Sequence, residues 1–376
     1  MRTTPTVLDS LALLTATADD LVVATVRDTH LAIVDRVTMP LRAATGVEQR
    51  PPGITDLVYA IISGSIGGAS KALEIAASTG IGPRLEAHVG GRFVNAAVNG
   101  LIGDELANAR PALGITMAVR VDGRDLTYAD FRTAFPQASR KVAVLLHGLC
   151  EDELAWSAHR ERLGTTYAEE LERAGWSVVM LRANSGLPVA TNAGALDHLM
   201  GRLTDHWPVP IERIALVGHS QGGLVMRTAT ALSDAPWVRT VTDLITLGTP
   251  HQGSHVARAA TAGSAALRRL PETAAFGRIL ERRSGGIRDL DKGLPLEVAV
   301  PDHIKVRLVS ASLGQRDSGW VATAAGDLLV QPQSALGARK GRRPLSSANT
   351  LHLGRSHHFH LLNDPRVHEA LREWLA

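Results

Sequence analysis

The sequence predicts an α/β protein in which a mainly parallel sheet carries helices on both faces. From about residue 142 onward, short apolar runs of strand length alternate with longer segments in which apolar residues recur at helical spacing. The runs are close to continuously apolar, as expected of strands that are buried on both faces. With 376 residues, of which 45% are hydrophobic, the chain is long enough for one large domain of this kind and an accessory segment.

The expected elements follow one another in a regular order. Residues 115–128 alternate apolar and polar side chains around Asp122-Gly123, which is typical of a β-hairpin. Strands are expected at 142–146, 177–182, 214–217, 244–247, 305–310 and 349–353. Helices are expected at 165–174, 192–206, 224–232 and 365–375.

Two segments depart from this order. Apolar residues recur at helical spacing over residues 8–112, so 1–114 is predicted to be an N-terminal helical segment that precedes a main domain at 115–376. Its many alanines and glycines would permit close packing on the main domain or across a homodimer contact, and the sequence does not choose between them. Residues 254–302 separate two strands and carry amphipathic patterns, which predicts a helical cap or lid.

Composition excludes several classes of protein. The single cysteine, Cys150, excludes an intramolecular disulfide. Residues 1–20 lack the pattern of a secretory signal, and no run reaches the roughly 20 apolar residues that span a bilayer, so we expect a cytoplasmic protein with no membrane span. The sequence pI is near 9.3, but the basic cluster at 339–343 has no interleaved aromatic residues, so no nucleic-acid partner is expected.

A candidate nucleophile lies in the motif Gly218-His219-Ser220-Gln221-Gly222, which ends an apolar run of strand length and opens a helix-like segment. A serine on such a turn is lifted out of the sheet, and glycines are needed on both sides because side chains there would crowd the turn. The pattern alone is weak in a chain with 35 glycines. The prediction of Ser220 as a nucleophile therefore depends on the residues that accompany it.

Candidates for an acidic partner follow Ser220 along the chain. Serine chemistry needs a base to take the hydroxyl proton and an acidic residue to orient that base. Asp327 follows the strand expected at 305–310, and Asp302 and Asp317 are alternatives from neighbouring loops.

Three histidines lie between the last expected strand and the terminal helix: His357, His358 and His360 are all candidate bases. Spacings of one and two residues do not let three imidazoles converge on one ion from an extended segment, and no cysteine or paired carboxylate completes a ligand set, so no metal site is expected. His219 and His251 lie next to the expected site, and we expect both to be structural.

Two backbone N–H groups are expected to bind the oxyanion that forms during acyl transfer. One belongs to Gln221, and the other to Leu149 in the loop after the first long strand, where His147-Gly148 offers a flexible turn. Cys150 follows this loop, but nothing nearby in the sequence would activate its thiol, so we expect a packed side chain.

Taken together, these motifs resemble the serine lipases and esterases of the α/β-hydrolase superfamily. Within it, the chain is most similar to the bacterial lipase-like branch related to the inositol-deacylase, or PGAP1-like, proteins. The resemblance rests on motifs at 146–149 (LHGL), 216–225 (LVGHSQGGLV), 247–254 (LGTPHQGS), 326–330 (GDLLV), 334–337 (SALG) and 358–362 (HFHLL). It implies the α/β-hydrolase fold, here with an N-terminal helical segment and a helical cap insertion.

Carried over position by position, the resemblance implies a role for five residues. Ser220 would be the nucleophile, Asp327 the orienting acid and His358 the general base, with the amides of Leu149 and Gln221 as the oxyanion hole. The chain departs from the family pattern at two positions. Leu328 stands where the residue after the acid is usually a second glycine, and His360 stands two residues past the histidine, where an acidic residue is common.

The function expected from these residues is a serine carboxylic-ester hydrolase that forms an acyl-enzyme, acts on a small-molecule or lipid ester and needs no cofactor. The same triad could act on an amide, a thioester or an acyl-transfer acceptor, because the pocket rather than the triad selects the substrate. A noncatalytic hydrolase-fold protein that binds a ligand or partner is the alternative from a different class.

Overall fold

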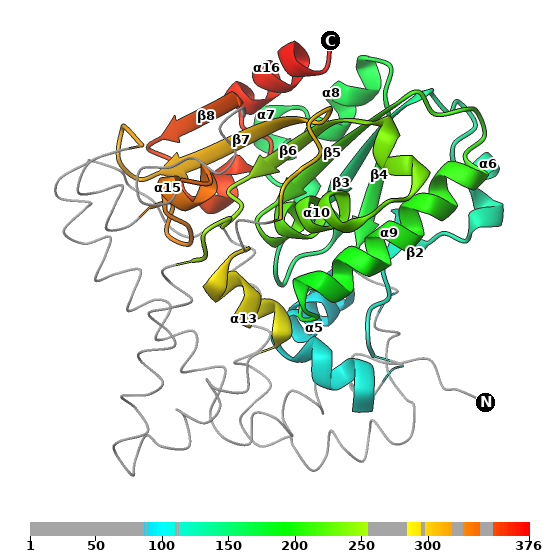
Figure 1. Cartoon of the computed structure of the whole chain (residues 1–376), viewed down its shortest axis with the longest axis horizontal. Helices are drawn as coiled ribbons and strands as arrows, with labels where there is room; N and C mark the ends of the chain where they lie inside the picture. Colours follow the sequence, from blue (N-terminus) through cyan, green and yellow to red (C-terminus); the bar gives the residue numbers. More distant parts are fainter. Residues whose placement is uncertain are drawn as a thin grey trace.

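The structure is a computed structural model that describes residues 86, 89–109, 111, 113–254, 284–294, 298–317, 326–338 and 349–376. In this part of the chain one eight-stranded sheet has the order β2-β1-β4-β3-β5-β6-β7-β8 (Figure 1). The parallel strands are β3 (Lys141–Leu146), β4 (Ser177–Arg182), β5 (Arg213–His219), β6 (Val241–Leu247), β7 (Lys305–Ser312) and β8 (Asn349–Gly354). The predicted α/β fold with a mainly parallel sheet is confirmed.

The predicted hairpin forms the antiparallel edge of the sheet. Strands β1 (Ala118–Val121) and β2 (Arg124–Asp125) pair antiparallel, and β1 also pairs antiparallel with β4. The turn between them is Asp122-Gly123, and both residues have positive φ, 49° and 72°. This conformation matches the right-handed twist of the two strands, which is why asparagine or aspartate followed by glycine is common there.

Helices cover both faces of the sheet (Figure 1). Those of the described residues are α5 (Val89–Ala109), α6 (Phe131–Ala134), α7 (Arg160–Leu163), α8 (Tyr167–Arg173), α9 (Val189–His206), α10 (Gln221–Leu232), α13 (Gly285–Lys292), α15 (Pro332–Ala335) and α16 (Pro365–Trp374). No helix in this part of the chain has both the length and the apolar character that a bilayer span requires.

Alternation along the central strands produces two separate cores. Val142, Val144 and Leu146 of β3 pack with α9 and α10 on one face of the sheet. Ala143 and Leu145 of the same strand pack with α8 and α16 on the other face. Successive strand residues point to opposite faces, so a strand that lies under helices on both sides is apolar at most positions.

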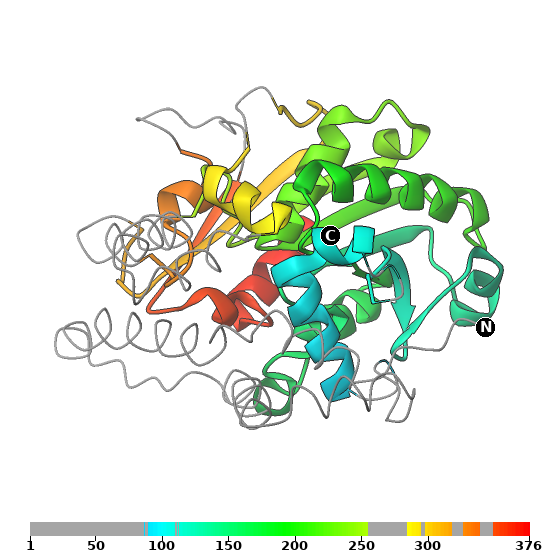
Figure 2. The same cartoon turned by 90° about the horizontal axis from the view of Figure 1, so that it is seen from below.

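One helix of the predicted N-terminal segment is described, and it packs on the main domain. In α5, a Cβ atom at Gly100 would lie 2.4 Å from Sγ of Cys150, and one at Gly103 would lie 1.9 Å from the side chain of Asn184. Ser284 donates to the carbonyl of Gly100 at 2.7 Å, which joins α5 to the start of α13. Figure 2 shows the two helices, cyan and yellow, against the same end of the sheet. Most of the segment 1–114 and of the predicted cap at 254–302 lies outside the described residues.

Candidate active site

Ser220 occupies the sharp turn between β5 and α10. The strand ends at His219 and the helix begins at Gln221, so the direction of the chain reverses at a single residue. Ser220 has φ 50° and ψ −119°, a conformation that residues with a side chain rarely adopt. Such strain costs about 1 to 3 kcal/mol and persists only where the surrounding structure imposes it. The turn raises the side chain at the carboxyl end of β5, where the residue is 9% exposed.

The two flanking glycines are required by the close approach of backbone. A Cβ atom at Gly218 would lie 2.4 Å from the amide nitrogen of Gly223, and one at Gly222 would lie 2.3 Å from the carbonyl oxygen of Leu146. Side chains at these positions would push the first turn of α10 away from β3 and β5. The glycines around Ser220 are therefore needed for the steric reason that the sequence predicts, because side chains there would crowd the turn.

Asp327 and His358 form a buried pair beside this turn. Nδ1 of His358 lies 2.8 Å from Oδ2 of Asp327, and the two side chains are 2% and 1% exposed. The other oxygen, Oδ1, accepts hydrogen bonds from the amides of Leu329 at 3.0 Å and Val330 at 2.7 Å. Leu328 has φ 82°, which explains why glycine is usual at this position. The leucine adopts the same turn, so the departure from the family pattern does not displace Asp327.

The His358 ring lies next to the segment that holds Ser220. The amide of Ser220 donates to the carbonyl of Leu247 at 2.8 Å, and the following residue, Gly248, faces the ring. A Cβ atom at Gly248 would lie 2.9 Å from Cε1 of His358. The ring of His219 is 4.8 Å from that of His358, measured between centroids. These contacts bring the end of β6, the turn at Ser220 and the histidine together.

The charge of Asp327 sets the protonation of His358. Burial disfavours the charged ring, but the attraction of Asp327, its hydrogen bond and the charge of Glu151 outweigh burial and raise the pKa of His358 above 6.5. Nε2 of His358 is buried and has no hydrogen-bond partner among the described residues. A neutral ring that donates from Nδ1 to the carboxylate keeps its lone pair on Nε2, which is the form that a general base needs.

The alternative acids and bases lie elsewhere. Asp302 and Asp317 are exposed on the surface. The rings of His357 and His360 stack on each other at 3.5 Å, and neither is bonded to Asp327. Burial and the neighbouring histidines lower the pKa of His357 to about 3 and that of His360 to about 4, so both rings are neutral.

The loop of residues 147–151 lies against Ser220 and is oriented by His147. Nε2 of His147 accepts from the amide of Ala183 at 3.0 Å, so its proton is on Nδ1, which donates to the carbonyl of Gly148 at 2.8 Å. That carbonyl and the amide of Leu149 belong to one trans peptide, so fixing the carbonyl also fixes the N–H, which points the opposite way. Neither the Leu149 amide nor the Gln221 amide has a hydrogen-bond partner in the described part of the chain.

Replacing His147 by alanine is expected to lower kcat for an ester about 10-fold to 100-fold with little change in KM, because a misplaced oxyanion donor is felt in the transition state. Steady-state kinetics of the variant measure this. The variant should also lose about 1 to 3 kcal/mol of stability, since the buried Ala183 amide loses its acceptor. An unchanged kcat in a destabilised variant would show that His147 does not orient the loop.

Comparison with known protein families matches one segment of the chain. Residues 192–268, which contain Ser220 and its turn, match the family described as the PGAP1-like alpha/beta domain. The protein has the α/β-hydrolase fold. The resemblance predicted from the motifs is thus confirmed for the segment around the candidate nucleophile, and the mostly parallel sheet flanked by helices is consistent with it. No match was found among curated proteins.

Several solved structures are similar to this hydrolase-fold chain at low sequence identity. The mature lipase BlEst2 of Bacillus licheniformis is 19% identical, over 62% of this chain and 91% of that chain, with a TM-score of 0.44. An esterase of Pyrococcus furiosus is 16% identical, over 63% and 83%, with a TM-score of 0.39. A bromoperoxidase of Bacillus anthracis is 12% identical, over 63% and 92%, with a TM-score of 0.41.

Two other reactive side chains near the site are held in structural contacts. Sγ of Cys150 lies 3.7 Å from the carbonyl of Ala97, and burial raises the pKa of the thiol to about 12, so a nucleophilic thiolate does not form. His251 lies with Nε2 3.2 Å from the hydroxyl of Thr246, and burial and the charge of Arg227 lower its pKa well below 6.5. Within the described ranges, no three histidine, cysteine or acidic side chains are placed to hold a metal ion.

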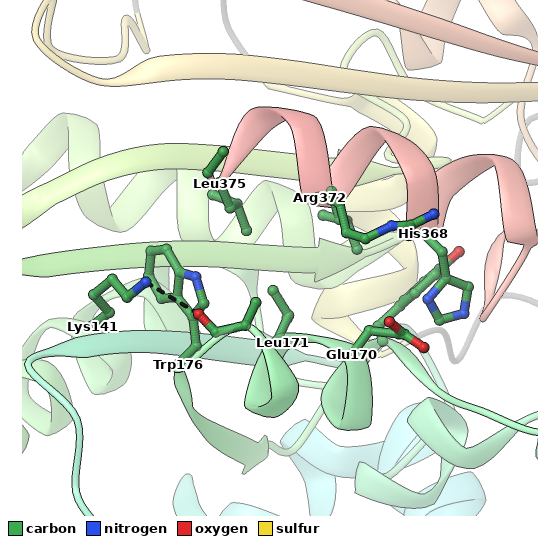
Figure 3. Close-up of a pocket in the computed structure, with 11 residues that line it drawn as sticks. Lys141, Glu170, Leu171, Trp176, His368, Arg372 and Leu375 are labelled. Carbon is green, nitrogen blue, oxygen red and sulfur yellow. Dashed lines mark hydrogen bonds between the residues drawn. The ribbon is translucent and has the colours of Figure 1, made fainter.

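A small cavity lies at the opposite end of the strands. It has a volume of about 100 Å³ and lies between α8 and α16, where Lys141, Trp176 and His368 line it (Figure 3). Lys141 is the first residue of β3 and Trp176 precedes β4, whereas Ser220 follows the carboxyl end of β5. The volume is that of about three water molecules. This cavity therefore plays no part in the chemistry at Ser220.

Asp152 follows the 147–151 loop directly, and its burial makes ionisation of its carboxyl unfavourable. Burial and the neighbouring Glu153 raise its pKa from the usual 3.8 to about 6. Oδ1 accepts from the amide of Leu154 at 2.9 Å, while Oδ2 has no partner in the described structure. Because the folded protein holds the proton more tightly than the unfolded chain, ionisation of this carboxyl opposes folding as the pH rises from about 4 to about 6.

Replacing Asp152 by asparagine is therefore expected to raise the free energy of unfolding at pH 7 by roughly 2 to 3 kcal/mol, the energy that corresponds to this change in pKa. Asparagine keeps the acceptor for Leu154 and removes the charge. Urea unfolding at pH 7 and at pH 4 measures the effect, and the gain should disappear at pH 4. Asp205→Asn is the matched control on an exposed residue. An equal gain at both pH values would contradict this explanation.

Proposed function

We propose that the protein is a serine carboxylic-ester hydrolase that works through an acyl-enzyme, with Ser220 as nucleophile, His358 as general base and Asp327 as the acid that orients it. The observation that carries the proposal is the buried Asp327–His358 pair, with 2.8 Å between Oδ2 and Nδ1, next to a serine in a strained strand-to-helix turn. A buried ion pair or a strained turn, taken alone, also occurs in proteins for purely structural reasons. A buried base that is oriented by a carboxylate and lies near a serine hydroxyl is the arrangement that acyl transfer requires.

In the proposed reaction, Nε2 of His358 takes the proton of the Ser220 hydroxyl as its oxygen attacks the ester carbonyl. The tetrahedral oxyanion receives hydrogen bonds from the amides of Leu149 and Gln221. His358 then gives the proton to the leaving alcohol, which leaves the acyl group on the serine. A water molecule, activated by the same histidine, attacks the acyl-enzyme and releases the acid.

The pH dependence of the reaction follows from the base. Only neutral His358 accepts the serine proton, and its pKa is raised above 6.5, so activity is expected to fall as the pH falls through a midpoint above 6.5. The side chain of Asp327, bonded to Nδ1, stabilises the imidazolium that forms in the transition state. The pH profile of kcat/KM for an ester measures this midpoint. A midpoint well below 6.5 would contradict the assignment of the base.

A panel of p-nitrophenyl esters with acyl chains of two to about twelve carbons, assayed beside matched amides and thioesters, tests the reaction class. Hydrolysis of esters with a burst of p-nitrophenol would support the acyl-enzyme. Faster turnover of an amide or thioester would assign the same residues to a different acyl substrate. Failure to hydrolyse any of them, together with binding of a ligand, would favour a noncatalytic hydrolase-fold protein that binds a ligand or partner.

A further inference from the structure

Glu151 places a carboxylate that is only 13% exposed between the two segments that carry Leu149 and Gln221. Its Oε2 atom accepts a hydrogen bond from the amide of Gly148 at 2.7 Å and lies 2.9 Å from Nδ1 of His219. Gly148 precedes Leu149 by one residue, and His219 precedes Gln221 by two. One carboxylate oxygen therefore links the two backbone segments whose amides must converge on a single oxyanion.

The link lies directly against the proposed nucleophile. A Cβ atom at Gly148 would lie 2.9 Å from Cβ of Ser220 and 3.0 Å from Oε2 of Glu151. Gly148 is thus enclosed between the serine and the carboxylate, with no space for a side chain. A displacement of Glu151 would move the Gly148 amide and, through the next peptide, that of Leu149.

The carboxylate is charged under ordinary conditions. Burial opposes ionisation, but the attraction and hydrogen bond of His219 and the hydrogen bond from the Gly148 amide outweigh it and hold the pKa of Glu151 at about 2. A charge-assisted hydrogen bond is about twice as strong as one between neutral groups. The hydrogen bonds through which Glu151 links the two segments are therefore charge-assisted and of the stronger type.

The charge also acts on the proposed base. The titratable groups that face His358 are Asp327 across the hydrogen bond, Glu151 from the loop after β3, His219 from the end of β5, and the adjacent His357. Of these, the two carboxylates favour the protonated ring. His219 lies between Glu151 and the base, with its ring centroid 4.8 Å from that of His358.

We propose that Glu151 is a positioning residue of the ester hydrolase. Its carboxylate fixes the separation of the Leu149 and Gln221 amides, and its negative charge stabilises the protonated His358 that forms as Ser220 attacks. The proposal rests on the function proposed above, because it concerns the amides and the base assigned there.

The test compares two glutamine variants whose substituted positions lie two residues apart in the chain. Glu151→Gln removes the charge and preserves the shape. Glu153→Gln removes the charge of a second carboxylate, which is buried and pairs with Arg120 at 3.1 Å instead of with Gly148 or His219. We expect the Glu151 variant to lose about 10-fold to 100-fold in kcat with KM changed less than about threefold. The Glu153 variant should lose stability and keep kcat within about threefold of wild type.

Two readouts separate positioning from a general structural effect. The acidic limb of the kcat/KM profile should move to lower pH in Glu151→Gln and stay in place in Glu153→Gln. A trifluoromethyl ketone, which forms a tetrahedral oxyanion on the serine, should lose affinity in proportion to kcat/KM. If Glu151→Gln does not fold, the pair His219→Asn and His219→Ala replaces it. Asparagine can still donate to the carboxylate and should retain activity that alanine loses.

Equal losses of kcat in the two glutamine variants, with the acidic limb unmoved, would overturn the positioning role and leave the ester hydrolase intact. Equal activities of His219→Asn and His219→Ala would do the same. A wild-type protein that neither hydrolyses esters nor reacts with a fluorophosphonate would instead overturn the proposed function, and the inference with it.

Discussion

Replacing Ser220 by alanine is expected to lower kcat for p-nitrophenyl esters by more than about 10⁴-fold. The hydroxyl is the proposed nucleophile, and the remaining oxyanion donors and binding groups supply only the residual catalysis that serine hydrolases keep without it. Initial rates at saturating ester, with enzyme purified free of the wild type, measure the loss. The free energy of unfolding of the variant should be close to that of the wild type, because alanine keeps the strained backbone conformation at φ 50°.

Ser220→Gly is the matched control for this prediction. Glycine should abolish activity equally, but it adopts a positive φ without strain, so the variant should be more stable than Ser220→Ala by about 1 kcal/mol. Thermal unfolding of the two variants compares them. Substantial ester hydrolysis by either one would remove Ser220 from the reaction.

Replacing Asp327 by asparagine is expected to lower kcat by about 10⁴-fold, the size of effect seen when the acid of a serine-protease triad is replaced in the same way. The asparagine amide would donate to Nδ1 of His358 and move the imidazole proton to Nε2, where it blocks the uptake of the serine proton. The amides of Leu329 and Val330 would still donate to the side-chain oxygen, so the fold of the loop should persist. Steady-state kinetics and circular dichroism measure the two effects.

Asp317→Asn is the control, because Asp317 is exposed and is one of the two alternative acids, with Asp302, that the sequence offers. It should keep kcat within about threefold of wild type. If replacing Asp317 lowers kcat as much as replacing Asp327 does, the carboxylate in contact with His358 is not the acid that the reaction requires.

The sequence predicted the parallel strands well because buried strands leave a direct signal. The expected runs at 142–146 and 177–182 coincide almost fully with β3 and β4, since most residues of a doubly covered strand are apolar. The start of α10 was less visible. Its glycines are poor helix formers, so the periodic pattern begins at 224, whereas the helix begins at Gln221 because the turn at Ser220 leads directly into it.

The choice among three histidines could not be made from spacing. His357, His358 and His360 lie in one short segment, and which of them meets Asp327 depends on the backbone contact between the two loops. The amide of His358 donates to the carbonyl of Asp327 at 2.9 Å, which fixes the register and turns this ring to the carboxylate. A contact across 31 residues of chain is not encoded in any local pattern.

Glu151 was missed for the same reason. Its partner His219 is 68 residues away, and the only local signal is an acidic residue in the loop that follows His147-Gly148. A carboxylate in a loop between a buried strand and a helix is most often a solvated side chain. Only the fold shows that this one points inward.

If its neighbours activate the Ser220 hydroxyl, a fluorophosphonate should react with it in the folded protein, and mass spectrometry of the labelled peptide identifies the residue that carries the label. We expect one phosphonate per chain, attached to Ser220, and no labelling of the heat-denatured protein or of Ser220→Ala. Label on another residue, or none on the folded wild type, would contradict this expectation.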